Sequence, residues 1–308
     1  MSKQWWHNAV VYQIYPRSFM DANGDGCGDL AGITQRLDYL AGLGVDAVWI
    51  SPFFTSPMVD NGYDISDYRG IDPRFGTLED FDALVARANQ LNIKILLDLV
   101  LNHSSDQHPW FKAALADPAS HYRDYYIFKK PAANGGPPNN WRSIFGGSAW
   151  QLDDASGEYY LHVFAKEQPH LNWENPRLRQ ELYDVVDWWL DRGVSGFRMD
   201  AITYIKKDPS YPSLPPDGPD GLADLSPGTQ TRPGIGAFLT EMRDTVFGPR
   251  NVFTVAEATG VPPQQLADFI GDDGYFTTIF DFNYCDIDIQ PGGIWHARSG
   301  HTVGQLRQ

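Results

Sequence analysis

Three acidic residues stand at the ends of short, largely apolar runs and give the sequence its clearest chemical signal. Asp98, Asp200 and Glu257 each end such a run, and Arg198 stands two positions before Asp200. A single acid in such a place is usually a structural salt-bridge partner. Three of them, one flanked by an arginine, are hard to explain as structure alone. Carboxyl groups held together can divide the work of catalysis, because one can donate a proton while an ionised one attacks.

The runs that carry these acids belong to a repeating pattern. Six short apolar runs alternate with helical patterns along the chain, at residues 10–15, 47–50, 93–98, 196–200, 252–257 and 276–281. Runs this short and this apolar are typical of strands that are buried on both faces, as in a parallel sheet. We therefore expect the acids to lie at the C-terminal edge of one sheet.

The segments between the strands carry helix signals. Thr77 precedes two acids and an apolar stripe, which predicts a helix that begins at residue 78. Pro176 opens another helix, and Gly193 ends it. Its predicted inner face is Leu178, Leu182, Val185 and Trp189. Alternating strands and helices predict an α/β fold with right-handed crossovers, and six units in series favour a barrel over an open sheet, which remains the alternative.

Two long insertions interrupt this rhythm, at residues 104–173 and 207–234. Both are rich in Pro and Gly, and both leave from the C-terminal ends of strands, where barrel active sites are built. We expect a first barrel segment at 1–103, a small inserted subdomain at 104–173, and a continuation of the barrel, with strands four to six, at 174–308.

Composition excludes several classes of function. The net charge of −15 argues against nucleic acid and against an anionic membrane surface as partners. No apolar run approaches the ~20 residues that span a bilayer, and the N-terminus lacks a signal-peptide pattern. The two cysteines, Cys27 and Cys285, exclude a disulfide framework. We expect a cytoplasmic protein without a membrane anchor, and no oligomeric state follows from the sequence.

Four segments resemble a known family. Residues 98–103 (DLVLNH), 196–200 (GFRMD) and 256–257 (AE) resemble the first three short conserved regions of the α-amylase superfamily, glycoside hydrolase family 13. Residues 168–173 (QPHLNW) resemble the family's motif at the end of its inserted domain. The order and spacing also match, and the resemblance covers nearly the whole chain. It implies a (β/α)8 TIM barrel with a subdomain inserted after the third strand.

By this resemblance, Asp200 is the nucleophile and Glu257 is the general acid/base of a retaining glycosidase. In such enzymes the two carboxyl groups lie about 5–5.5 Å apart, which leaves no room for a water molecule between them. Arg198 is expected to keep Asp200 ionised and to lower its pKa. Glu257 is expected to have a raised pKa, so that it can donate a proton near neutrality.

The resemblance also implies a sugar-binding pocket. Asp60 resembles the acid with which exo-acting α-glucosidases grip the non-reducing end through charge-assisted hydrogen bonds. The Asn61-Gly62 dipeptide beside it indicates no more than a turn when taken alone. Tyr63 is expected to stack under the reacting sugar, and His103 to contact one of its hydroxyls, while Asp98 orients its neighbours. The complete expected substrate-binding set is Asp60, Tyr63, His103, Phe145, Phe164 and Arg198.

A polar loop near the N-terminus is a candidate metal site. Asp21, Asn23, Asp25 and Asp29 resemble the residues with which similar α-glucosidases bind one structural Ca²⁺. The loop starts like an EF-hand, but its twelfth position is Gly32 rather than Glu, so it is not an EF-hand. The alternatives are Mg²⁺ at the same oxygens and a polar turn without a metal.

The chain also departs from the family pattern. The family's third essential acid, in an Asn-His-Asp motif after the seventh strand, has no counterpart here. We expect the last two strands and the C-terminal β-domain to be absent from these 308 residues, and the chain alone to be inactive unless they are supplied.

The sequence favours an exo-acting α-glucosidase that cleaves disaccharides or short oligosaccharides. Ala201, directly after the expected nucleophile, favours α-1,4 over α-1,6 bonds by resemblance. A sucrose isomerase or transglucosylase of the same family is the first alternative, since it shares these motifs. A non-catalytic homologue that serves as a partner subunit is the second, and the intact Asp200 and Glu257 argue against it. A carbohydrate-binding module would not need acids at three strand ends, and Asp60 disfavours an endo-acting α-amylase.

Overall fold

A six-stranded, all-parallel sheet forms the centre of the molecule. The computed structural model describes residues 4–271, 273–280 and 282. The sheet order is β1-β2-β5-β10-β12-β13. The strands are β1 (Val11–Ile14), β2 (Ala47–Ile50), β5 (Lys94–Val100), β10 (Gly196–Asp200), β12 (Phe253–Glu257) and β13 (Thr278–Phe280). These are the six predicted runs in their sequence order, and they form part of a β/α barrel. Asp281 lies outside the described residues.

The register of the sheet explains how the acids meet. Arg198 pairs with Asp98 across β10 and β5, and Asp200 pairs with Val100. The sequence predicted that Asp98 ends its strand, and this prediction was wrong. The strand continues for two more residues because Leu99 and Val100 are apolar and buried and pair with β10. Since all strands run in the same direction, the C-terminal ends of β10 and β12 still share one edge.

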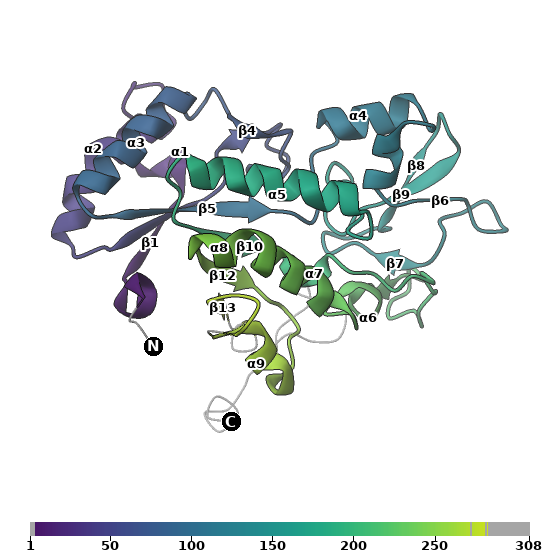
Figure 1. Cartoon of the computed structure of the whole chain (residues 1–308). Coiled ribbons are helices and arrows are strands. Elements are labelled where there is room, and N and C mark those ends of the chain that lie inside the picture. The colour runs from purple at the N-terminus through teal and green to yellow at the C-terminus, as the bar shows by residue number, and fades with distance from the viewer. Residues whose placement is uncertain (1–3, 272, 281, 283–308) are drawn as a thin grey trace.

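Helices flank the sheet and connect its strands (Figure 1). The longest are α2 (Leu30–Gly42), α3 (Leu78–Gln90), α5 (Pro176–Asp191) and α7 (Ile235–Met242). Thr77 caps α3 in a capping box with Asp80, as its hydroxyl predicted. Asn175 caps α5, and Gly193 follows that helix with a φ of 97°, a left-handed conformation that favours glycine. The predicted inner face of α5 is buried.

The first insertion carries a small sheet of its own. Strands β6 (Phe128–Lys129), β9 (Glu158–Leu161) and β8 (Trp150–Asp153) pair antiparallel in that order. They follow α4 (Pro109–Ala116) and the 3₁₀ helix η2 (His121–Tyr125), and in Figure 1 this group lies beyond one end of α5. The insertion has a separate core around Trp141 and Trp150. The boundaries 104–173 stay a prediction, although these elements all fall inside them.

The second insertion packs on the first. Strand β11 (Ala223–Asp224) pairs with β7 (Trp141–Arg142). The Trp141 indole donates to the carbonyl of Pro212 at 2.9 Å, and Arg142 forms ion pairs with two acids of the second insertion, Asp217 and Asp220. The sequence did not predict this contact between segments that lie far apart in the chain.

Short elements complete the described chain. They are η1 (Trp5–Asn8), α1 (Pro16–Phe19), β3 (Phe54–Thr55), β4 (Asp67–Ile71), η3 (Ile202–Tyr204), α6 (Ser226–Thr229), η4 (Arg243–Phe247), α8 (Gly248–Arg250), η5 (Pro263–Gln265) and α9 (Leu266–Phe269). Over the residues that the structure describes, we find no helix with the length and apolarity that crossing a membrane requires.

Candidate active site

One arginine joins the three predicted acids. Arg198 Nη1 lies 2.8 Å from Oδ1 of Asp98 and 2.6 Å from Oδ1 of Asp200. Its Nη2 lies 2.7 Å from Oε2 of Glu257. The guanidinium is nearly buried, with 9% of its side chain exposed. Because one fixed positive charge faces three carboxyl groups, the cluster holds excess negative charge when all three are ionised.

The two candidate catalytic carboxyl groups differ in proton affinity. Burial, followed by the charge of Asp200, raises the pKa of Glu257 to about 7, against the lowering effect of Arg198. Burial also raises the pKa of Asp200 to about 6, again against Arg198. The direction predicted for Asp200 was therefore wrong, because Arg198 is shared and does not offset the desolvation of a buried carboxylate. The order still leaves Glu257 as the group that keeps its proton longer.

Asp98 does not line the pocket but bonds to residues that do, Tyr63 and Arg198. Its Oδ2 accepts hydrogen bonds from the Trp49 indole and from the Tyr63 hydroxyl, each at 3.1 Å. Its Oδ1 accepts from Arg198. Asp98 is fully buried, so its contacts are with the protein. This arrangement agrees with the predicted role of orienting neighbours.

A tight turn presents Asp60 to the site. The buried Asp64 carboxylate accepts backbone hydrogen bonds from Val59 and Asp60, each at 3.0 Å. Asn61 and Gly62 both have positive φ values, 50° and 104°, which the Asn-Gly signal for a turn anticipated. The sequence therefore predicted the turn, but it did not predict the hydrogen bonds by which Asp64 stabilises it.

The predicted residues converge on one pocket of about 430 Å³. All eight candidate catalytic and substrate-binding residues line it: Asp60, Tyr63, His103, Phe145, Phe164, Arg198, Asp200 and Glu257. Further lining residues are Ile144, Ala201, Tyr204, Thr259 and Phe282. Sequence analysis missed Ile144, Tyr204, Thr259 and Phe282 as site residues. Thr259 was open to prediction, because it follows Glu257 by two positions just past a strand end.

Aromatic side chains form the outer wall of this pocket. The rings of Phe145 and Phe164 lie 5.6 Å apart, and Phe164 also lies 5.3 Å from the His103 ring. Phe145 is 47% exposed, so an apolar surface at the mouth of the pocket faces solvent. Aromatic faces of this kind are suited to packing against sugar rings.

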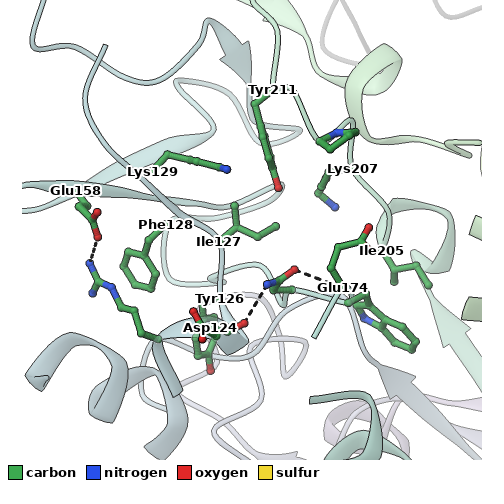
Figure 2. Close-up of a pocket in the computed structure, with 14 residues that line it drawn as sticks. Asp124, Tyr126, Ile127, Phe128, Lys129, Glu158, Glu174, Ile205, Lys207 and Tyr211 are labelled. Carbon is green, nitrogen blue, oxygen red and sulfur yellow. Dashed lines mark hydrogen bonds and ion pairs between the residues drawn. The ribbon is translucent and has the colours of Figure 1, made fainter. Parts of the chain in front are cut away.

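A second pocket, of about 500 Å³, lies where the inserted subdomain meets the segment after β10 (Figure 2). Several of its charged side chains already contact other protein groups. Arg123 pairs with Glu158 at 2.8 Å, and Lys129 lies over the Tyr211 ring. The buried Lys207 amine lies 2.6 Å from His170 Nε2. This pocket has no counterpart of the carboxyl cluster around Arg198, so the chemistry favours the first pocket.

The candidate metal loop carries an all-oxygen set of side chains. The Asp21 carboxylate accepts two backbone N–H groups of its own loop, at 2.6 and 2.8 Å, while Asn23 and Asp25 bond to each other. Asp29 is buried and caps α2. Across the described part of the chain, no group of three or more His, Cys, Asp or Glu side chains takes a metal-holding arrangement. The loop thus offers oxygen donors of the type that hard cations such as Ca²⁺ take, but its three carboxylates are not arranged around a common site in this structure.

Comparisons with known proteins identify the family of the chain. A family model described as the alpha amylase catalytic domain matches residues 13–300. The probable oligo-1,6-glucosidase 3 of Bacillus subtilis (strain 168) is 47% identical over 305 residues, which are 98% of this chain and 53% of the relative. The oligo-1,6-glucosidase of Parageobacillus thermoglucosidasius is 48% identical over 299 residues, covering 97% of this chain and 53% of that enzyme.

A solved structure has the same fold over the whole length of this chain. The isomaltulose synthase of Protaminobacter rubrum superposes with a TM-score of 0.93 at 42% identity, covering all of this chain and 54% of that one. The chain thus spans about half the length of the relatives that it matches.

Proposed function

The chain belongs to the α-amylase family, and from that membership we propose that it contributes the catalytic acids of a retaining, exo-acting α-glucosidase. The observation that carries the proposal is the Arg198 cluster, in which Asp200 and Glu257 share one guanidinium and differ in proton affinity. Both side chains line a pocket of sugar size.

The proposed reaction proceeds in two steps. Protonated Glu257 donates its proton to the glycosidic oxygen while ionised Asp200 attacks the anomeric carbon, so the C–O bond breaks and a glucosyl ester forms. Glu257, now ionised, then takes a proton from water, which attacks the ester and releases glucose with retained configuration. Arg198 stays charged throughout and lowers the cost of negative charge on both acids.

Exo action is supported by the turn at residues 60–64. Asp60 is fixed to the same pocket as the acid pair, and its carboxylate suits charge-assisted hydrogen bonds to the terminal hydroxyls of a sugar. A chain end held there would place the first glycosidic bond at Glu257. The expected products are single glucose units.

Two linkages compete. The resemblance at Ala201 favours α-1,4 bonds, whereas both curated relatives described above are named for α-1,6 bonds. Maltose and isomaltose are therefore the matched pair of substrates. Sucrose is the third substrate to include, because the likeness to an isomaltulose synthase favours glucosyl transfer within sucrose as a second candidate function.

We also propose that Ca²⁺ binds the loop at Asp21, Asn23, Asp25 and Asp29, with Mg²⁺ as the alternative ion. The support is the oxygen-only set and its resemblance to the loop of similar α-glucosidases. None of these four residues lines the active-site pocket, so the ion would act on stability rather than on the reaction.

The test is sugar conversion with both linkages and with sucrose. The 308-residue chain would be assayed alone and together with the C-terminal remainder of the Bacillus subtilis relative. Release of α-glucose from maltose or isomaltose, seen by NMR before mutarotation, would support the proposal. Initial release of β-glucose would contradict retention, and isomaltulose from sucrose would favour the second candidate. No conversion in any combination would count against the catalytic reading.

A further inference from the structure

Gln168 connects two of the proposed sugar-gripping residues without lining their pocket. Its side-chain Nε2 lies 2.9 Å from Oδ2 of Asp60 and 3.0 Å from Nε2 of His103. Gln168 and His103 are both buried, at 0% and 1% exposure. Asp60 and His103 face the pocket, and Gln168 lies behind them. The three residues come from different parts of the chain.

The orientation of the Gln168 amide is determined by its surroundings. Its Oε1 accepts the backbone N–H of Ala165 at 3.0 Å, and its own backbone N–H donates to the carbonyl of Ala165 at 2.9 Å. A flipped amide would place an oxygen against the Asp60 carboxylate and an NH₂ group against an N–H. The amide nitrogen, with its two hydrogens, therefore faces Asp60 and His103.

This orientation also selects the form of His103. Its Nε2 has two neighbours, the Gln168 amide nitrogen at 3.0 Å and the carbonyl of Tyr63 at 3.2 Å. A neutral ring nitrogen can accept from the first or donate to the second, but not both. The two hydrogens of the Gln168 amide favour the form in which Nε2 of His103 accepts. The ring proton is then on Nδ1, which is buried and has no hydrogen-bond partner among the described residues. Burial lowers the pKa of His103 to about 4, so the ring is neutral at ordinary pH.

We propose that Gln168 is a positioning residue that holds Asp60 and His103 as one unit at the pocket, with Nε2 of His103 as an acceptor. One amide group fixes the rotamers of both residues, and a terminal sugar then meets them already arranged. The inference rests on the proposed function, because it assigns Gln168 a part in gripping the sugar that Glu257 and Asp200 would cleave.

Binding separates this inference from the proposed function. Dissociation constants for maltose and isomaltose would be measured by calorimetry in a Glu257→Gln background, where no turnover consumes the sugar. Gln168→Met keeps the length of the side chain and removes both donated hydrogen bonds. We expect its dissociation constant to rise about 10- to 100-fold, the scale of a small misplacement of binding groups. Gln151→Met, on β8 of the same subdomain, is the matched control and should not change it.

A second variant tests positioning against loss of packing. Gln168→Glu keeps the acceptor for Ala165 but places a carboxylate beside Asp60. At pH 8 the two like charges repel, and binding should weaken about as much as in Gln168→Met. At pH 5 a shared proton can restore the bridge, so binding should recover to within about threefold of the parent. The other titratable groups that act on this part of the site are His103, Asp64 and His170, which interacts with His103.

Two further readouts address the mechanism. In an Asp60→Ala background, Gln168→Met should cost clearly less than in the parent, because the two residues act through one contact. Imidazole nitrogen NMR should show the His103 proton on Nδ1 in the parent and on Nε2, bonded to Tyr63, in Gln168→Met.

Equal sugar affinity in parent and Gln168→Met, or equal weakening of Gln168→Glu at both pH values, would overturn the inference. Absence of sugar binding in the Glu257→Gln parent would instead overturn the proposed function.

Discussion

Ala201 donates its backbone N–H to Oε2 of Glu257 over 3.0 Å, and it does so from a left-handed conformation with a φ of 39°. A non-glycine residue in this region costs about 1–2 kcal/mol, and the surrounding structure must offset that cost. Ala201 directly follows Asp200 in the chain and bonds to Glu257. The backbone at this point therefore links the positions of the two carboxyl groups.

Removal of either carboxyl group should give a distinct product with azide. In a preparation whose wild-type form hydrolyses p-nitrophenyl α-glucoside, Asp200→Gly should lose about 10⁴-fold or more in kcat, as loss of a catalytic nucleophile does elsewhere. Azide should then replace the missing side chain and form β-glucosyl azide by a single inversion. Glu257→Ala should instead yield α-glucosyl azide, since azide attacks the glucosyl ester. Asp154→Ala, on an exposed turn, is the control, and exchanged anomers would reverse the two roles.

The pH dependence of kcat/KM should be bell-shaped in the free enzyme. The proposed mechanism requires ionised Asp200, whose pKa is raised to about 6, and protonated Glu257, whose pKa is raised to about 7. The rate should therefore rise through about pH 6, fall through about pH 7 and peak between them, with both limbs belonging to the interacting pair. Initial rates at low substrate concentration across pH 4–9 measure this. A flat profile above pH 7 would exclude Glu257 as the proton donor.

Glu257→Gln should stabilise the protein at alkaline pH. A carboxyl group whose pKa is raised on folding favours the folded state at low pH, and this contribution is lost as the pH rises through about 7. The variant should therefore gain on the order of 1–3 kcal/mol in the free energy of unfolding at pH 8, and little at pH 4. Urea unfolding at both pH values tests this, with the exposed Glu79→Gln as control. Equal effects at both pH values would contradict an electrostatic origin.

Asp60→Ala should weaken substrate binding more than turnover. Loss of one charge-assisted hydrogen bond costs about 1.5–3 kcal/mol, which corresponds to an increase in KM of roughly 10- to 150-fold. Steady-state kinetics on maltose and isomaltose measure this, and Asp67→Ala, on the exposed start of β4, is the control. An unchanged KM would remove the case for a pocket that is closed at the sugar's end.

Chelation should destabilise the chain if the N-terminal loop holds a metal. A ligand present at 100 times its dissociation constant stabilises the folded state by about 2.7 kcal/mol, so EDTA should lower Tm by several degrees. EGTA should have the same effect if the ion is Ca²⁺ and a smaller one if it is Mg²⁺. In Asp25→Ala the response to chelators should vanish, and in Asp154→Ala it should remain. A Tm that is unchanged by both chelators would contradict metal binding and would identify the loop as a polar turn.

The sequence predicted those parts of the fold that depend on local pattern. Short apolar runs predicted the six strands that the structure describes in the central parallel sheet, and the cap at Thr77 predicted the start of α3. The acids of β10 and β12 were predicted to meet because parallel strands share an edge. The end of β5 was not predicted correctly. A polar residue after an apolar run indicates a strand end, and only the pairing with Arg198 shows that Asp98 lies inside the strand.

The remaining misses come from competition between groups distant in the chain. The direction of the pKa shift of Asp200 depends on how many acids share Arg198 and on how deeply the site is buried. Neither quantity follows from residue types. The contact of Gln168 with Asp60 and His103 likewise depends on how the inserted subdomain packs on the barrel. The motif that contains Gln168 was recognised, but its place in the site was not.

The pairing of β7 with β11 adds a second long-range contact to the assembly of the site. These strands join two insertions that are separated by α5 and β10, so the loop they close is long and its closure entropy is high. The pairing of β5 with β10, which brings Arg198 to Asp98, also joins segments far apart in the chain. The Arg198 cluster of the barrel and Phe145 of the first insertion line one pocket, so the complete pocket requires both closures. Because non-local pairings are slow to form, the pocket would be completed late relative to the helices around it.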